Sequence, residues 1–307
     1  MGKKDTAVKN FIEDNRIFAD LFNGAVFEGK QIVNAGMLNK EDPEHKTMLS
    51  IRKAVGKQRD LLRRTSVKAH YVVLGVEDQS KVHYAMTVRN MLYDALEYEA
   101  QCRERIVTEG RYDLTAEEIL SGIAKDTKLM PVYTVILYTG EDPWDGPRCL
   151  HDMLDIPEEM KNIIPDYPLK IVSVREWNKP ELFKTELGDF FRLLKNVYTK
   201  SAEEVEVSPY IMKLTGVVSN VKTLIRKAEK KEGTEEKIMC RAAEELMEEG
   251  REEERKNTER ERLRADRAEK KNKEIEKKNK KIEEKNKKIE EENKRLKEEL
   301  ARMKAKA

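Results

Sequence analysis

A seven-residue repeat near the end of the chain limits its fold more than any other feature of the sequence. Successive blocks read NKEIEKK, NKKIEEK, NKKIEEE, NKRLKEE and LARMKAK. Two positions in each block, three residues apart, form two series: Asn272, Asn279, Asn286, Asn293 and Leu300, and Ile275, Ile282, Ile289, Leu296 and Met303. These are the a and d positions of a coiled-coil heptad. Five heptads predict a helix of roughly 50 Å.

Asparagine at the a position narrows the ways in which such a helix can pair. An amide between helices fixes register and oligomer state at a cost in stability, most often in a parallel dimer, whereas Ile at d favours higher oligomers. We therefore expect a weak homo-oligomeric coiled coil, with a dimer favoured. The alternative is a single solvated helix whose apolar stripe is too narrow to pair.

The repeat also accounts for the polar composition of the chain. Of its 307 residues, 39% are charged and 38% are hydrophobic, which is too polar for one compact domain of this length. Residues 251–307 hold 23 basic and 16 acidic residues, a net charge of +7, which leaves −5 for residues 1–250. We expect a folded domain over 1–200, a helical extension over 201–250 and a charged coil over 251–307.

Several classes of protein are disfavoured. The first residues, MGKKDTAVKNFIEDN, lack the apolar segment of a secretory signal, and no run approaches the roughly 18 apolar residues of a membrane span. Three distant cysteines, Cys102, Cys149 and Cys240, fit a reducing cytosol better than a disulfide framework or a zinc site. The net charge of +2 argues against a chain that is basic throughout, although the basic tail can attract phosphates. We expect a cytoplasmic protein without a membrane anchor.

The body alternates apolar runs with amphipathic segments. Near-continuous apolar runs predict buried strands over 70–76, 131–138 and 169–174, and a short strand is expected over 60–62. Helical spacing predicts helices over 8–22, 87–105, 181–198, 208–230 and from 235 onward. This order favours the α/β class, with a mixed sheet covered by helices.

Acidic residues mark the ends of the first strands. Asp60 lies in one predicted strand, and Glu77 and Gln79 end the next, where alternation points them to the same face. If the neighbouring strand presents Asp60 to that face, two carboxylates and an amide converge. Mg²⁺ binds through one or two carboxylates with water and phosphate, and it can activate water against a phosphodiester. The spacing alone equally describes a solvated strand end.

Longer motifs give this site a family context. The stretches are DNRIFADLFN from Asp14, KQRDLLRR around Asp60, VLGVEDQSKVHYAMTVRNMLYDALEYEAQ from Val73 and LMPVYTVILYTGEDPWDGPRCLHDML from Leu129. In this order they resemble the Rpn family of recombination-promoting nucleases, the YhgA-like transposases, within the PD-(D/E)XK nuclease superfamily. The likeness covers roughly residues 10–230. It implies a restriction-endonuclease-like αβββαβ core for the domain over 1–200.

The resemblance also assigns roles to the acidic residues. It implies that Asp60 and Glu77 bind Mg²⁺ or another divalent cation such as Mn²⁺ or Ca²⁺. Gln79 stands where the superfamily usually has Lys; it can orient water by hydrogen bonding but carries no charge. Asp60 follows Gln58-Arg59 and not proline, so this half of the motif is degenerate.

Supporting residues are expected around this core. An acidic residue of the first helix often contributes in the superfamily, and Asp14 is the candidate, with Asn15 and Asp20 as rivals. Arg89 and Tyr93 match a family pattern and share a helix face, from which they can hold a phosphate or the Glu77 carboxylate. The alternative is a surface arginine beside a packed tyrosine.

Other candidates have weaker support. His83 is expected to be a loop residue, although it is close enough to Gln79 to be considered for catalysis. Trp144, in GEDPWDGP, is expected to anchor a turn and not to stack on a base. Four basic residues can supply a local groove for DNA. These are Arg63, Arg64, Lys68 and Lys81.

The sequence thus predicts a metal-dependent DNA endonuclease linked to recombination or mobile elements. No base-reading motif stands out, so we expect nicking or cleavage with little sequence specificity. The alternative is a catalytically degenerate nuclease fold that acts as a binding and oligomerisation module through its coiled coil.

Overall fold

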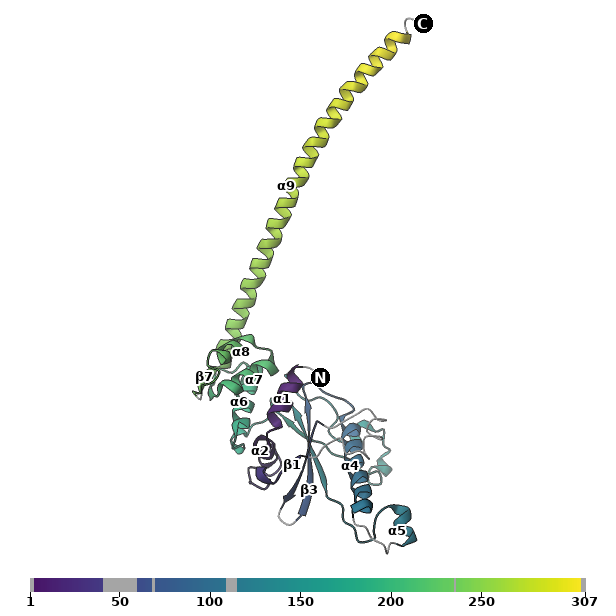
Figure 1. The fold of residues 1–307 in the computed structure, drawn as a ribbon, viewed down its shortest axis with the longest axis vertical. Helices are drawn as coiled ribbons and strands as arrows, with labels where there is room; N and C mark the ends of the chain where they lie inside the picture. Colours follow the sequence, from purple (N-terminus) through teal and green to yellow (C-terminus); the bar gives the residue numbers. More distant parts are fainter. Residues whose placement is uncertain (1–2, 41–59, 68–69, 109–114, 235, 305–307) are drawn as a thin grey trace. The chain divides into compact units, whose positions relative to one another are not determined.

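The structure is a computed structural model that describes residues 3–40, 60–67, 70–108, 115–234 and 236–304 (Figure 1). The chain divides into two compact units, Met1–Glu248 and Glu249–Ala307. Gln58, Arg59 and Lys68, which figured in the sequence expectations, lie outside the described residues. Within the described part, no helix combines the length and the apolar character needed to cross a bilayer.

A mixed five-stranded sheet forms the centre of the first unit, as the alternation of apolar runs predicts. Its strands lie in sequence order, and they are β1 Asn39–Lys40, β2 Leu61–Val67, β3 His70–Gln79, β4 Val132–Tyr138 and β5 Lys170–Ser173. The β1–β2 and β2–β3 pairs are antiparallel, whereas β3–β4 and β4–β5 are parallel. The parallel strands therefore all end at the same edge of the sheet.

Helices cover both faces of this sheet (Figure 1). On one face, α1 Lys3–Ile12, α2 Asn15–Ala25 and α6 Glu186–Thr199 share a hydrophobic core with alternate residues of β3 and β4. On the other face lies α4 Met86–Thr108, whose Met86 packs with Ile136, Tyr138 and Trp144. The two faces of β3 therefore meet different helices.

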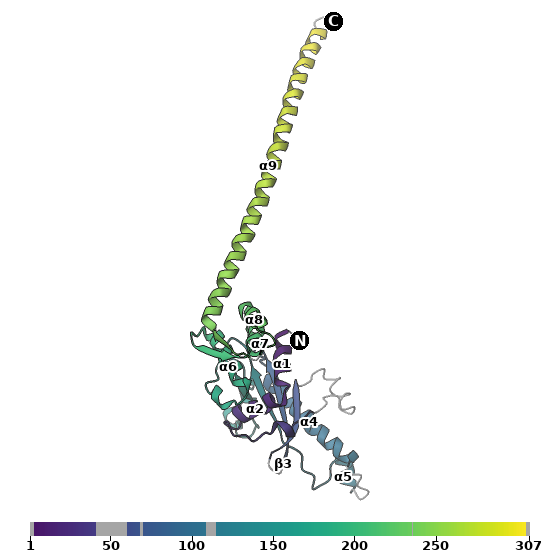
Figure 2. The ribbon, with the colours of Figure 1, turned by 60° about the vertical axis from the view of Figure 1, so that its left-hand side comes forward.

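The remaining elements are short or extend the C-terminal side of the first unit. The short ones are the helix α5 Ala116–Ser121 and the 3-10 turns η1 Ala35–Met37, η2 His151–Met153, η3 Glu158–Met160 and η4 Pro180–Leu182. Two further helices, α7 Pro209–Ser219 and α8 Lys222–Glu229, accompany a two-stranded sheet of β6 Glu204–Val207 and β7 Ile238–Arg241. The chain ends in α9 Ala242–Lys304, which Figures 1 and 2 show as one uninterrupted helix.

Local side-chain chemistry explains where the helices differ from the prediction. The expected helix over 8–22 is two helices, because Asp14 caps α2 by accepting the Arg16 amide. The expected helix over 208–230 is also two, since Asn220 takes a left-handed conformation (φ 64°) that ends α7.

Two other helices begin later than predicted. Thr185 caps α6, so this helix starts at Glu186 after the turn η4 and not near residue 181. Residues 238–241 pair with β6 and bury Cys240, so the last helix starts at Ala242 and not at residue 235. The strand expected over 60–62 is longer and begins at Leu61, which leaves Asp60 just before it.

Candidate active site

Asp60 and Glu77 come together where β2 begins beside the end of β3. Leu61 pairs with Val76, so the antiparallel register, continued by one residue, sets Asp60 opposite Glu77. The Asp60 amide donates to Glu77 Oε1 at 3.3 Å. The Asp78 amide in turn donates to Asp60 Oδ2 at 3.0 Å, so β3 holds Asp60 through the Glu77 side chain and the Asp78 backbone. The two residues that the sequence singled out are thus in contact, through the Asp60 amide and the Glu77 carboxylate.

Arg89 contacts the same carboxylate from the helix side. Glu77 is fully buried and lies beside Ile136 in the parallel register, on the face covered by α4. Arg89 Nη2 lies 3.3 Å from Glu77 Oε2. Arg89 Nε donates to Tyr93 Oη at 2.8 Å, one helical turn further along. Arg89 therefore contacts Glu77, and the buried Tyr93 contacts Arg89.

The pKa values of Asp60 and Asp78, at this edge of the sheet, are both raised, and for partly different reasons. Burial raises the pKa of Asp60, and the hydrogen bond from the Asp78 amide opposes that shift. Burial raises the pKa of Asp78 to about 8, and repulsion from Asp60 and Asp5 adds to the effect. Asp78 therefore keeps its proton to a higher pH than a solvated aspartate does.

Asp78 and Asp5 are functional candidates that the sequence reasoning did not name. Along β3, Asp78 points to the face opposite Glu77, where α1 brings Asp5 into the same field. Asp5 also accepts a hydrogen bond from Ser80 Oγ at 2.8 Å. We call Asp5, Asp60 and Asp78 the acidic cluster. The sequence did hold a signal for Asp78. In the strand VLGVEDQ, Glu77 and Asp78 are adjacent, so alternation places their carboxylates on opposite faces of the sheet.

The other predicted site residues have structural roles nearby. Gln79 Nε2 donates to the carbonyl of Asp78 at 2.9 Å. Asp14 caps α2 and forms an ion pair with the exposed Arg16 at 2.8 Å. From the first helices the structure therefore brings Asp5, and not Asp14, next to Asp78.

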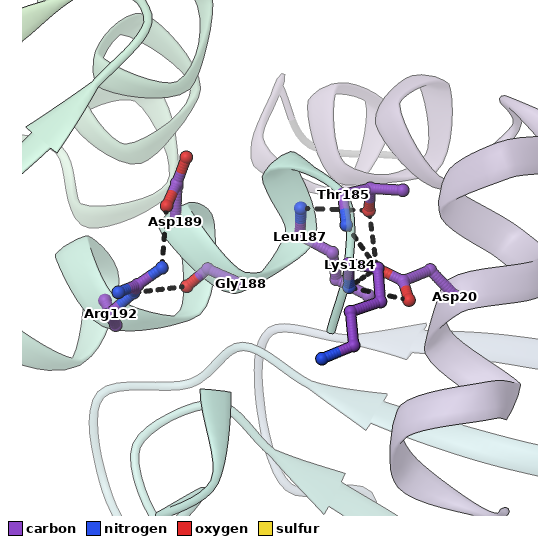
Figure 3. A network of polar contacts seen from close by, with 7 residues as sticks. All are labelled: Asp20, Lys184, Thr185, Leu187, Gly188, Asp189 and Arg192. Atoms are coloured by element: carbon purple, nitrogen blue, oxygen red, sulfur yellow. Dashed lines mark hydrogen bonds and ion pairs between the residues drawn. The ribbon is translucent and has the colours of Figure 1, made fainter. Parts of the chain in front are cut away.

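The rivals of Asp14 also hold the fold together. Asn15 donates to the carbonyl of Leu38 at 3.0 Å. Asp20, 3% exposed, accepts from the amides of Lys184 and Thr185 and from the Thr185 hydroxyl at 2.6–2.9 Å. Figure 3 shows these contacts, which fasten α2 to the start of α6.

Three of the four basic residues expected near the site are described, and they do not share an exposed groove. Arg63 is 3% exposed, stands over the ring of Phe18 and donates to the carbonyl of Leu62. Arg64 lies 3.6 Å from the buried Glu97. Lys81 is exposed.

The two remaining sequence candidates fit their expected structural roles. The carbonyl of His83 accepts the Met86 amide in the loop where α4 begins. Trp144 is 5% exposed, packs edge-on against Tyr138 and donates to the carbonyl of Gly146, which confirms it as a turn anchor.

A cavity of 580 Å³ opens at the carboxyl ends of β3 and β4, beyond Gln79. Lys4, Ser80, Lys81 and Thr139 contribute to its lining. The Ser80 hydroxyl also donates to Asp5, so a residue that lines the cavity contacts the acidic cluster. Ligands of α/β sheets commonly bind outside the carboxyl ends of parallel strands.

The donors at this edge fit a hard divalent cation. Asp60, just before β2, and Glu77 of β3 carry carboxylate oxygens, and Mg²⁺ needs only one or two carboxylates when water and substrate phosphate complete its shell. Among the described residues, no group of three or more His, Cys, Asp or Glu side chains is arranged to hold a metal ion. Two carboxylates suit an open site, which other oxygen donors complete, better than a closed structural one.

Comparison with known proteins gives one match. A family model described as "Putative transposase, YhgA-like" matches residues 55–228. The matched range includes Asp60, Glu77, Gln79, Arg89 and Tyr93, and it ends before α9. No curated protein and no solved structure matches.

Proposed function

Because the chain belongs to the YhgA-like transposase family, we propose that it is a metal-dependent endonuclease that hydrolyses phosphodiester bonds in DNA. The observation that carries the proposal is the meeting of Asp60 and Glu77 at the start of β2 and the end of β3. A family linked to transposition supports DNA as the substrate and recombination or mobile elements as the setting.

The order of elements supports a PD-(D/E)XK core. The order α1, α2, β1, β2, β3, α4, α5, β4 contains the αβββαβ pattern of that superfamily when α2 and the short α5 are counted as additions. In this assignment Asp60 is the aspartate of the first half-motif, Glu77 is the acidic residue of the second, and Gln79 replaces its lysine. Asp60 and Glu77 would hold the divalent cation.

Each nearby residue has a defined task in this proposal. A divalent cation held by Asp60 and Glu77 would supply Lewis acidity, which can activate water and neutralise charge on a phosphate. Arg89 balances the charge of the buried Glu77 carboxylate and orients it through their 3.3 Å ion pair. The amide of Gln79 can orient the attacking water, after leaving the Asp78 carbonyl that it bonds in this structure. Asp78, with its raised pKa, retains a proton near neutral pH beside Asp60.

The strand-end cavity has a lining of mixed charge. Lys4 and Lys81 can pair with phosphates at its rim, whereas Glu141, Asp142 and Asp145 oppose an anion there. The net +7 of residues 251–307 adds a salt-sensitive attraction to DNA. Because Arg63 and Arg64 are engaged within the fold, this binding surface is smaller than the sequence implied.

A binding and oligomerisation module is the second candidate, and one observation favours it. Four large apolar residues of α9 lie exposed at intervals of seven. Such a stripe suits association even if the nuclease core is degenerate, as the Lys-to-Gln departure at position 79 allows.

Cleavage of supercoiled plasmid separates the two candidates. Purified protein would be incubated with plasmid and Mg²⁺ or Mn²⁺, beside Glu77→Gln and beside a reaction containing EDTA. The endonuclease proposal expects nicked or linear plasmid from wild type alone. Equal cleavage by Glu77→Gln, or cleavage that survives EDTA, would overturn it.

A further inference from the structure

The second half of α9 presents an unpartnered apolar stripe. Ile275, Ile282, Ile289 and Leu296 are 45%, 54%, 54% and 56% exposed. They occupy the d positions of the heptad, and Asn272, Asn279, Asn286 and Asn293 occupy the a positions beside them. Large aliphatic residues exposed in a regular row indicate a surface that another helix covers.

The charged residues at the e and g positions, which flank this stripe, indicate the identity of the partner helix. In a parallel coiled coil, each g residue faces the e residue five positions later on the partner helix, and these pairs set partner choice and orientation. When α9 is paired with a second α9 in register, five successive g–e pairs all join opposite charges. They are Arg264–Glu269, Lys271–Glu276, Lys278–Glu283, Lys285–Glu290 and Glu292–Lys297.

The change of sign along the helix makes this match specific. The g position is basic up to Lys285 and acidic at Glu292, and the e position changes from Glu290 to Lys297 in the same step. The charges at g and e change sign in the same heptad, so every g–e pair between the two helices still joins opposite charges. A solvated helix face does not require the two reversals to coincide.

The asparagines select the parallel orientation independently. A parallel in-register pair sets each a residue against the same residue of the partner, so every Asn meets an amide that can accept and donate. An antiparallel pair sets a against d, so Asn279 would face an apolar residue and lose that partner. An antiparallel pair would also set e residues against e residues and g residues against g residues. Because four of the five g residues are basic, no such register pairs every charge with an opposite one.

We propose that α9 binds α9 of a second copy of this chain as a parallel, in-register dimer across residues 264–297. The occupant of the stripe is thus an identical helix, chosen by five repeated charge pairs and four facing asparagines. The proposal concerns α9 alone, so it stands whether or not the Asp60–Glu77 site cleaves DNA.

Disulfide trapping tests the orientation. In full-length protein, Asn272→Cys places one thiol in the pairing layer, and mild oxidation is expected to give a reducible covalent dimer. Lys273→Cys, one residue outside the layer, and the wild-type chain with Cys102, Cys149 and Cys240 set the background. A yield for Asn272→Cys no higher than background would overturn the proposal. So would a mixed dimer between Asn279→Cys and Leu296→Cys chains, because those positions meet only in an antiparallel pair.

Charge reversal tests the choice of partner. The triple variant Lys271→Glu, Lys278→Glu, Lys285→Glu makes three g–e pairs repulsive, and sedimentation is expected to show dimer affinity reduced by roughly 100-fold. The matched variant Glu276→Lys, Glu283→Lys, Glu290→Lys should dissociate likewise, and an equal mixture of the two should restore a dimer. Either variant remaining as tight as wild type, a mixture that stays monomeric, or a wild-type mass other than two chains would contradict the proposal.

Discussion

The backbone amide of Asp60 donates to Glu77 Oε1 across 3.3 Å, joining the residue before β2 to a residue near the end of β3. These residues are 17 positions apart, and the antiparallel register brings them level. The contact ties the orientation of the Glu77 carboxylate to the backbone position of Asp60. The functional proposal depends on this pair remaining together.

Arg89→Ala tests how the buried carboxylate is held. Glu77 is fully buried, so removing its ionic partner should lower the free energy of unfolding by roughly 3–5 kcal/mol. Urea denaturation measures this loss. Arg16→Ala is the control, because the Arg16–Asp14 pair is exposed and its loss should change the unfolding free energy much less. Equal losses for the two variants would contradict the description of Glu77.

Asp20→Asn tests the junction of α2 with α6 (Figure 3). Both Asp20 carboxylate oxygens accept from Lys184 or Thr185, and an amide group would present a donor to donors. We expect a loss of roughly 1.5–3 kcal/mol of unfolding free energy.

Asp189→Asn is the matched control for that junction. It removes the charge from an ion pair with the half-exposed Arg192 and should cost about 1 kcal/mol or less. If Asp20→Asn denatures at the same urea concentration as Asp189→Asn, the network in Figure 3 is not the anchor described.

Stability should fall as pH rises because of Asp78. Its folded pKa is about 8 against an ordinary value of 3.8, so the native state holds more protons between these values. Unfolding free energy therefore decreases across that window and levels off above it. Asp78→Asn should remove most of this slope while keeping the shape of the side chain. Urea denaturation from about pH 5 to pH 9, in EDTA, measures both chains; identical slopes would refute the assignment.

Pairing through α9 should affect how DNA is cut, if both proposals hold. A parallel dimer tethers two bodies at the same end of the coil, so two cuts can fall on one duplex. We expect wild type to linearise plasmid early, and the Lys271→Glu, Lys278→Glu, Lys285→Glu variant to accumulate nicked circles first. Gel analysis of the time course measures the ratio. An unchanged ratio of linear to nicked plasmid would contradict this link between pairing and cleavage. It would leave the endonuclease proposal and the dimer proposal to their own tests.

Much of the fold was predictable from burial patterns. Strands β3, β4 and β5 are covered on both faces, so they read as continuous apolar runs. Strand β2 was underestimated because its sequence, LLRRTSV, looks solvated. Arg63 is nevertheless buried there, since backbone carbonyls and the Phe18 ring satisfy its guanidinium.

The site was predictable in part for similar reasons. Strand alternation and family resemblance both pointed to Asp60 and Glu77, which the structure places together. Asp5 was missed because it contacts Ser80 across 75 positions of sequence, a distance that no local pattern spans. Asp14 was favoured in its place, but an aspartate before a helix has the simpler task of capping it.

Single-turnover cleavage of a labelled DNA duplex by Asp60→Asn tests the central claim most directly. Asp14→Asn serves as the control, since it changes the same chemical group at a helix cap outside the Asp60–Glu77 pair. With Mg²⁺ present and equal folding verified by circular dichroism, we expect Asp60→Asn to cleave at least about 100-fold more slowly than wild type, and Asp14→Asn to cleave within about threefold of it. Equal rates for Asp60→Asn and wild type would contradict the assignment of this site.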